Sequence, residues 1–300
     1  MTITTARIRE LREATGAGLL DCKKALQANG GNFEKATDYL REKGLSQASQ
    51  KAGQGTKAGL VIVKERNDCI CAVQVGCETD FVAHTDDFKT FAHHVADRVL
   101  ADASLTEAEH VLAADLIPGK ATADVIQEMI TRLGENIVVQ GVARYTSGGA
   151  GTIVKGYVHA GALEGDYNPM EGRIGVLVEL GASNVTAADG AALRDLAHDL
   201  ALHITDLKPS YLSPDDIPDN VIQKQRETLM AQLAEENKPD PIKAKIAEGR
   251  LDKFYQEVCL MKQAFVKDDS VSIEELLQQK SVEMGTPITI NRFAHFEVSN

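Results

Sequence analysis

Thr79, Asp80, Phe81 and Val82 form the stretch of this 300-residue chain best suited to act on another molecule. The stretch places a carboxylate beside an aromatic ring, in a predicted loop between an apolar strand and an amphipathic helix. Such a pair can offer a charge and a large apolar surface to a partner, but it supplies no bond-making group. The alternative is that Phe81 fills a local core and Asp80 caps the helix, since most aromatic side chains are buried.

Other residues that could carry out chemistry lack the neighbouring residues that such chemistry requires. Thr15-Gly16-Ala17-Gly18 followed by Lys23-Lys24 looks like a phosphate-binding loop, yet a predicted helix precedes it and the GxxxxGK[ST] spacing is absent. The histidines show no HExxH or Cys/His metal spacing, and no GxSxG, SxxK or kinase signature pairs a nucleophile with a base. We therefore expect a protein that is not an enzyme, with no catalytic residue, no metal and no cofactor.

The five cysteines include no CxxC spacing. Cys69 and Cys71 point to the same side of a predicted strand and read as small apolar residues, so we expect reduced thiols and a cytoplasmic location. Redox activity through this pair is a distant alternative. The net charge of −12 repels phosphate backbones, and no run of about 18 apolar residues occurs, so we expect no direct nucleic-acid partner and no membrane.

The elements that must position the Thr79 stretch occur twice, at an offset of 105 residues. Each copy has an alternating apolar strand, a glycine and a helix with four apolar residues on one face. The aligned pairs are Cys71/Val176, Val73/Val178, Val75/Leu180, Phe88/Leu193, Phe91/Leu196, Val95/Leu200 and Val99/Ile204. The connecting loops have equal length, but Asp80 and Phe81 fall opposite Val185 and Thr186. Because Thr85 or Asp86 lies nearer the helix start, Asp80 is not needed as a cap, which favours a special role for this loop.

The pattern along the chain predicts an α+β fold with several units. Residues 1–45 read as three short helices, and residues 46–58 as a linker that is helical in its first part. Residues 59–150 and 151–300 form two related α+β subdomains. Two charged helices at about 218–257 indicate a projecting hairpin or, nearly as well, an ordinary packed pair. The expected elements are strands 59–65, 69–76, 136–145 and 288–298 and helices 87–101, 106–117, 121–132, 218–237 and 241–257, with residues 152–206 repeating the first unit.

Two long motifs resemble the elongation factor Ts family. They are LREATGAGLLDCKKAL, from Leu11 to Leu26, and CETDFVA, from Cys77 to Ala83. Shorter agreements lie at Gly134–Ile137, Arg173–Val178, Glu248–Arg250 and Phe265–Val266, in the family's order. The resemblance covers residues 3 to 298, and the two long motifs together make chance implausible.

This resemblance implies a guanine-nucleotide exchange factor that binds elongation factor Tu in its GDP form. It would accelerate GDP release by displacing the GTPase's magnesium ion, so that GTP can bind. Residues 1–45 would be a ubiquitin-associated-like domain. Thr79 to Val82 would enter the GTPase near its magnesium ion, with Phe81 wedged between partner side chains and Asp80 moving a partner helix.

Further partner contacts are implied by the same resemblance. Arg12, Leu19 and Leu20 would grip the GTPase domain, and His159 with the strand at Arg173 would hold another partner domain. The carboxy-terminal helical module of some members is missing here, so its contacts do not transfer. A homodimer is left open. The main alternative function is an adaptor or chaperone-like protein that grips a peptide or ubiquitin-like partner through Leu19 and Leu20, without dependence on GDP.

Overall fold

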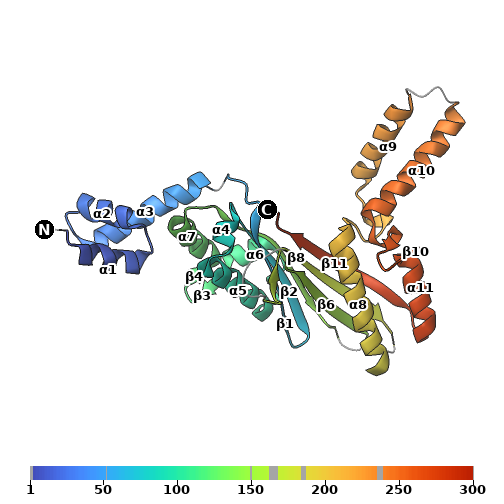
Figure 1. Ribbon diagram of the computed structural model, residues 1–300, viewed down its shortest axis with the longest axis horizontal. Helices are drawn as coiled ribbons and strands as arrows, with labels where there is room; N and C mark the ends of the chain where they lie inside the picture. Colours follow the sequence, from blue (N-terminus) through green and yellow to red (C-terminus); the bar gives the residue numbers. More distant parts are fainter. Residues whose placement is uncertain are drawn as a thin grey trace.

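The computed structural model describes residues 3–51, 53–148, 151–161, 168–183, 187–234 and 239–299. Three helices lie at one end of the molecule, a central body combines sheets with helices, and a helical hairpin projects beyond it (Figure 1). The predicted α+β class, with its three-helix unit and projecting hairpin, is confirmed. In the described part of the chain, no helix is long and apolar enough to cross a bilayer.

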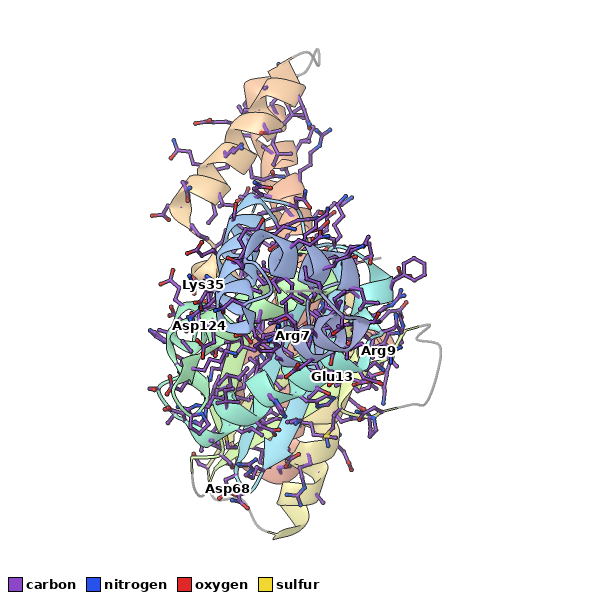
Figure 2. All side chains as sticks on the ribbon, turned by 90° about the vertical axis from the view of Figure 1, so that its left-hand side faces the viewer. Arg7, Arg9, Glu13, Lys35, Asp68 and Asp124 are labelled. Carbon is purple, nitrogen blue, oxygen red and sulfur yellow. The ribbon has the colours of Figure 1, made fainter. Side chains whose placement is uncertain are left out.

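The three amino-terminal helices are α1 (Thr5–Thr15), α2 (Leu19–Ala28) and α3 (Phe33–Lys51). Gly16 ends α1 with a positive φ of 68°, a conformation that glycine adopts without strain. The shared core contains Leu11, Ala17, Cys22, Ala25, Leu26, Ala36 and Leu40. Charged side chains such as Arg9 and Glu13 cover the outer face of α1 (Figure 2).

The first part of the expected linker is helical, as predicted, because α3 continues without a break through residues 46–51. Helix α3 packs along α7 (Thr122–Leu133), and Gly44 permits the close approach because a Cβ there would collide with Thr131. This tertiary contact explains why a polar segment without apolar periodicity stays helical.

The first subdomain has a sheet of order β5-β2-β1-β7. Its strands are β1 (Ala58–Arg66), β2 (Cys69–Cys77), β5 (Ile137–Thr146) and β7 (Glu171–Gly172), all antiparallel. Alternation along β2 directs Cys71, Val73 and Val75 into the core shared with α5 (Asp86–Ala101). The N–H of Phe88 donates to Thr85 Oγ1 at 3.3 Å, so Thr85 caps α5, as the sequence indicated.

Residues 106–117 were predicted to be helical, and this prediction is only partly right. Helix α6 (Ala108–Ala113) is followed by β3 (Asp115–Ile117), which pairs with β4 (Lys120–Ala121). Gly119 turns the chain between them with a φ of 76°, and its N–H donates to Asp115 Oδ2 at 3.1 Å. The dipeptide Pro118-Gly119 is a turn signal that outweighs the helical periodicity.

The second subdomain repeats the first on a sheet of order β11-β8-β6. Its strands are β6 (Thr152–His159), β8 (Ile174–Ala182) and β11 (Ile288–Glu297), and α8 (Ala187–Leu207) lies on the sheet. The predicted repeat is confirmed, because every aligned apolar pair lies in the corresponding cores of the two subdomains. Val185 and Thr186, opposite Asp80 and Phe81 in that alignment, lie outside the described residues.

Strand β7 joins the subdomains, because it follows β6 in the chain but pairs with β1 of the first sheet. Glu171 on β7 is almost fully buried and lies 2.9 Å from Lys89 Nζ and 3.0 Å from His93 Nε2 of α5. Burial raises the pKa of Glu171, but the contacts from His93 and Lys89 outweigh it and hold the pKa below its usual range. The two sheets also pack face to face, where Gly156 and Gly175 leave no room for a Cβ.

The hairpin consists of α9 (Asp219–Ala234) and α10 (Asp240–Val258), with Leu229, Leu233 and Leu251 buried between charged outer faces. It projects beyond the body, which decides against an ordinary packed pair (Figure 1). At its base, Gln263 Nε2 donates to the carbonyl of Glu257 at 2.9 Å. Gln263 Oε1 accepts from His203 Nε2 at 3.1 Å, while His203 Nδ1 accepts from the N–H of Val266 at 3.2 Å. Burial lowers the pKa of His203, in keeping with this neutral form.

The remaining described elements lie around the hairpin base. They are η1 (Pro214–Asp216), η2 (Leu260–Lys262), β9 (Ala264–Phe265), β10 (Asp268–Ser272) and α11 (Ile273–Met284). None of them was predicted, and α11 contributes Ile273, Leu276 and Leu277 to the core of the second subdomain.

Candidate partner-binding site

The segment Thr79 to Val82 is not the loop that was predicted. Residues Asp80–Ala83 form a single helical turn, α4, between β2 and α5. Val82 and Ala83 face the core of the first subdomain and are buried there. Phe81 points outward and is 83% exposed, and Asp80 is exposed beside it. The alternative that Phe81 fills a local core is therefore wrong, and Val82 has that place.

Phe81 is unusual because the protein holds a large apolar side chain in water on a well-anchored element. Transfer of a phenylalanine side chain out of water gains about 1.5–3 kcal/mol, so leaving it exposed forgoes stability unless a partner covers it. Asp80 begins α4, and its carbonyl accepts from His84 Nδ1 at 2.6 Å, which places the imidazole proton on Nδ1. The arrangement can present an apolar wedge and a carboxylate together.

The cysteine beside this turn is not activated. Cys77 Sγ is 3.1 Å from the carbonyl of Thr79, and burial raises the pKa of this thiol to about 12. Burial likewise raises the pKa of Cys71 to about 12, so neither thiol is a nucleophile at neutral pH. Within the described ranges, no group of three or more His, Cys, Asp or Glu side chains could hold a metal ion. The high pKa of Cys71 argues against redox activity through Cys69 and Cys71.

The amino-terminal residues assigned to partner binding are also accessible. Leu20 is 73% exposed and Leu19 is 46% exposed at the start of α2, which begins two residues before the predicted Asp21. Arg12 is exposed near the end of α1. Lys51, at the end of α3, lies 3.0 Å from Glu78, directly before Thr79. The three-helix unit is therefore tied to the base of the Phe81 turn.

His159 belongs to a different part of the molecule. It is exposed at the end of β6 in the second sheet, opposite Ile174, and its carbonyl accepts from the N–H of Arg173 at 3.0 Å. Arg173 and His159 are thus adjacent, as the implied second contact requires. Contact of any of these residues with a partner stays a prediction.

Sequence reasoning missed one residue that supports the turn. Glu135 accepts from the backbone N–H of Thr79 at 2.9 Å and from the Thr79 hydroxyl at 2.6 Å. Its segment, Gly134–Ile137, was noticed only as part of the resemblance. Pairing of the predicted strands 69–76 and 136–145 could have indicated it, because that pairing brings the end of one beside the start of the other.

Known proteins resemble this chain over nearly its whole length. The family described as Elongation factor TS matches residues 78–300. The elongation factor Ts of Clostridium perfringens (strain SM101 / Type A) is 40% identical over 297 residues, which cover 98% of this chain and 92% of that protein. The protein of the same name from Symbiobacterium thermophilum is 39% identical, with 98% and 91% covered. That from Aquifex aeolicus is 37% identical over 306 residues, with 99% and 98% covered. The chain therefore belongs to the elongation factor Ts family of translation elongation factors.

Proposed function

We propose that this protein binds elongation factor Tu in its GDP form and accelerates the release of GDP, so that GTP can bind. The observation that carries the proposal is the exposed Phe81, held beside Asp80 on a turn whose next residue is buried in the core. Family membership points to elongation factor Tu as the partner, and the exposed Phe81 and Asp80 supply the contact surface. No covalent step, metal or cofactor of its own is required.

The mechanism is a coupling between two binding equilibria. In the GTPase, a magnesium ion and the nucleotide phosphates stabilise each other electrostatically. Phe81 enters near that ion and separates partner side chains, while Asp80 repositions a partner helix, and the displaced metal loosens the nucleotide. Reciprocity requires that GDP and magnesium in turn weaken binding of this protein, and a coupling of about 1.4 kcal/mol changes each affinity tenfold.

The other contacts hold the partner while Phe81 acts. Leu19, Leu20 and Arg12 grip the GTPase domain, and His159 with Arg173 holds a second domain. Because the first group is tied to the α4 base through Lys51 and Glu78, binding energy at one contact supports the geometry of the next. A nucleic-acid partner is not part of the proposal, since the chain carries a net charge of −12.

The decisive experiment measures release of a fluorescent GDP from elongation factor Tu after addition of excess unlabelled GDP. We expect this protein to accelerate release at stoichiometric amounts, and rising magnesium to reduce the acceleration. If release is unchanged at stoichiometric amounts at every magnesium concentration, the proposal is wrong.

The second candidate, an adaptor that grips a peptide or ubiquitin-like partner, rests on the exposed Leu20. It predicts binding that ignores GDP and magnesium. Capture of elongation factor Tu on immobilised protein, weakened by added GDP and magnesium, would support exchange. Capture of another protein with no such dependence would support the adaptor.

Replacing Leu20 by serine should weaken binding to elongation factor Tu without affecting folding. Removing one buried leucine contact costs about 1.5–3 kcal/mol, which corresponds to at least about a tenfold loss of affinity. Binding is measured by titration calorimetry with nucleotide-free GTPase. The control is Val282→Ser on α11, because Val282 is 83% exposed and far along the chain from every assigned contact. Equal affinities of the two variants would remove Leu20 from the partner surface.

A further inference from the structure

Two carboxylates at the base of α4 form hydrogen bonds between the end of β2 and the start of β5. Glu78 and Thr79 follow β2, Glu135 and Asn136 precede β5, and Cys77 pairs with Ile137 where these strands meet. Glu135 accepts from the N–H and the hydroxyl of Thr79. Glu78 accepts from the N–H of Asn136 at 2.7 Å. Each segment therefore binds the backbone of the other through a carboxylate.

The α4 turn needs this support because it is too short to be stable alone. A helix of four residues lies far below the length at which local propensity suffices. Thr79 occupies its N-cap position, yet its side chain makes no capping hydrogen bond to α4. The hydroxyl donates to Glu135 instead, 56 positions away in the chain. The direction of the turn is thus determined by Glu135 on one side and by buried Val82 on the other.

Glu78 extends the same arrangement to the amino-terminal helices. Lys51 Nζ lies 3.0 Å from Glu78, and Asn136 Nδ2 donates to the carbonyl of Gln54 at 2.8 Å. Burial raises the pKa of Glu78, but the N–H of Asn136 and the ammonium of Lys51 outweigh it and hold the pKa below its usual range. Glu78 thus accepts as a carboxylate at neutral pH.

We infer that Glu135 and Glu78 are positioning residues for nucleotide exchange, which fix the direction in which α4 presents Phe81 and Asp80. The inference rests on the proposed function and adds residues that act without touching the partner. Glu135 acts through Thr79, and Glu78 acts through Asn136. Their contribution is orientation, which matters because small misplacements of a working group can reduce rates strongly.

The experiment compares Glu135→Ala with Glu135→Gln. Glutamine keeps an oxygen that accepts from the N–H of Thr79, and its amide can donate to the Thr79 hydroxyl. Both contacts with Thr79 are therefore retained while the negative charge is removed. We expect Glu135→Ala to lower the maximal rate of GDP release by about 10- to 100-fold, and Glu135→Gln to stay within about threefold of the unmodified protein. Hydrogen exchange at the amides of residues 80–83 should accelerate in the alanine variant only.

A double-mutant cycle identifies the path of action. If Glu135 works through α4, then Glu135→Ala adds a smaller loss in a Phe81→Ala background than in the unmodified protein, because only the placement of Asp80 is left to disturb. Full additivity overturns the inference, and so does a glutamine variant as slow as the alanine variant, which would assign a direct charge effect. Unchanged release by Glu135→Ala also overturns it.

A second variant and a second measurement cover the two ways in which the first experiment can fail. If Glu135→Ala does not fold, Thr79→Val removes the same hydroxyl contact, and hydrogen exchange at the amides of residues 80–83 should accelerate in it. If the unmodified protein fails to accelerate GDP release, the proposed function falls. The amide exchange of residues 80–83 then still reports whether Glu135 orders α4, so the two failures are distinguishable.

Discussion

Phe81→Ala is expected to slow GDP release from elongation factor Tu by about 30-fold or more at saturating protein. Truncation of an aromatic anchor at the centre of an interface costs about 2 kcal/mol or more, which sets this figure. The side chain is 83% exposed, so the same change should alter the free energy of unfolding by no more than about 0.5 kcal/mol. Stopped-flow release of fluorescent GDP and urea unfolding give the two quantities.

The control for Phe81→Ala is Phe81→Leu, which keeps apolar bulk and should recover part of the rate. A large fall in melting temperature together with normal exchange by the folded fraction would contradict the assigned role. Such a result would show that Phe81 supports the fold of the first subdomain and not the partner contact.

Phe88→Ala is expected to have the opposite pattern. Phe88 lies seven positions later, on α5, and is fully buried in the core of the first subdomain. Replacing a buried phenylalanine by alanine costs about 3–5 kcal/mol, because apolar contacts are lost and a cavity remains. Urea unfolding followed by circular dichroism should show that loss, while exchange per folded molecule stays near normal.

Leu193→Ala is the matched comparison for Phe88→Ala, since Leu193 occupies the equivalent buried place in the second subdomain. It should cost about 2–5 kcal/mol. If Phe88→Ala left stability unchanged, the description of α5 as the core helix of the first subdomain would be wrong. The two phenylalanines thus separate folding from function with one substitution type.

The buried faces of the repeated unit could be predicted because the spacing of apolar residues can be read directly from the sequence. Phe88, Phe91, Val95 and Val99 recur at helical spacing, and all are buried in the core. Helix α11 was missed although Ser272 and Glu275 form a capping box at its start, with Glu275 Oε2 accepting from the N–H of Ser272 at 2.8 Å. That signal was available in the sequence.

The site could be predicted only in part. Its four residues, and the reason to single them out, came from comparing the two copies of the unit and from the family motif. The helical form of residues 80–83 could not be predicted, since one turn carries too little local preference to identify it. The partner of Thr79 was missed because Glu135 lies 56 positions away, and only the pairing of the two predicted strands brings it close.

The sequence by itself determined which residues are apolar and at what period, and so the repeated unit, its cores and the family. Tertiary structure alone decided which side of α4 faces water. Burial of Val82 and the hydrogen bonds from Thr79 to Glu135 turn Phe81 outward. Both depend on contacts between segments far apart in the chain. A local sequence states that a phenylalanine is present, whereas only the surrounding contacts determine whether it fills a core or meets a partner.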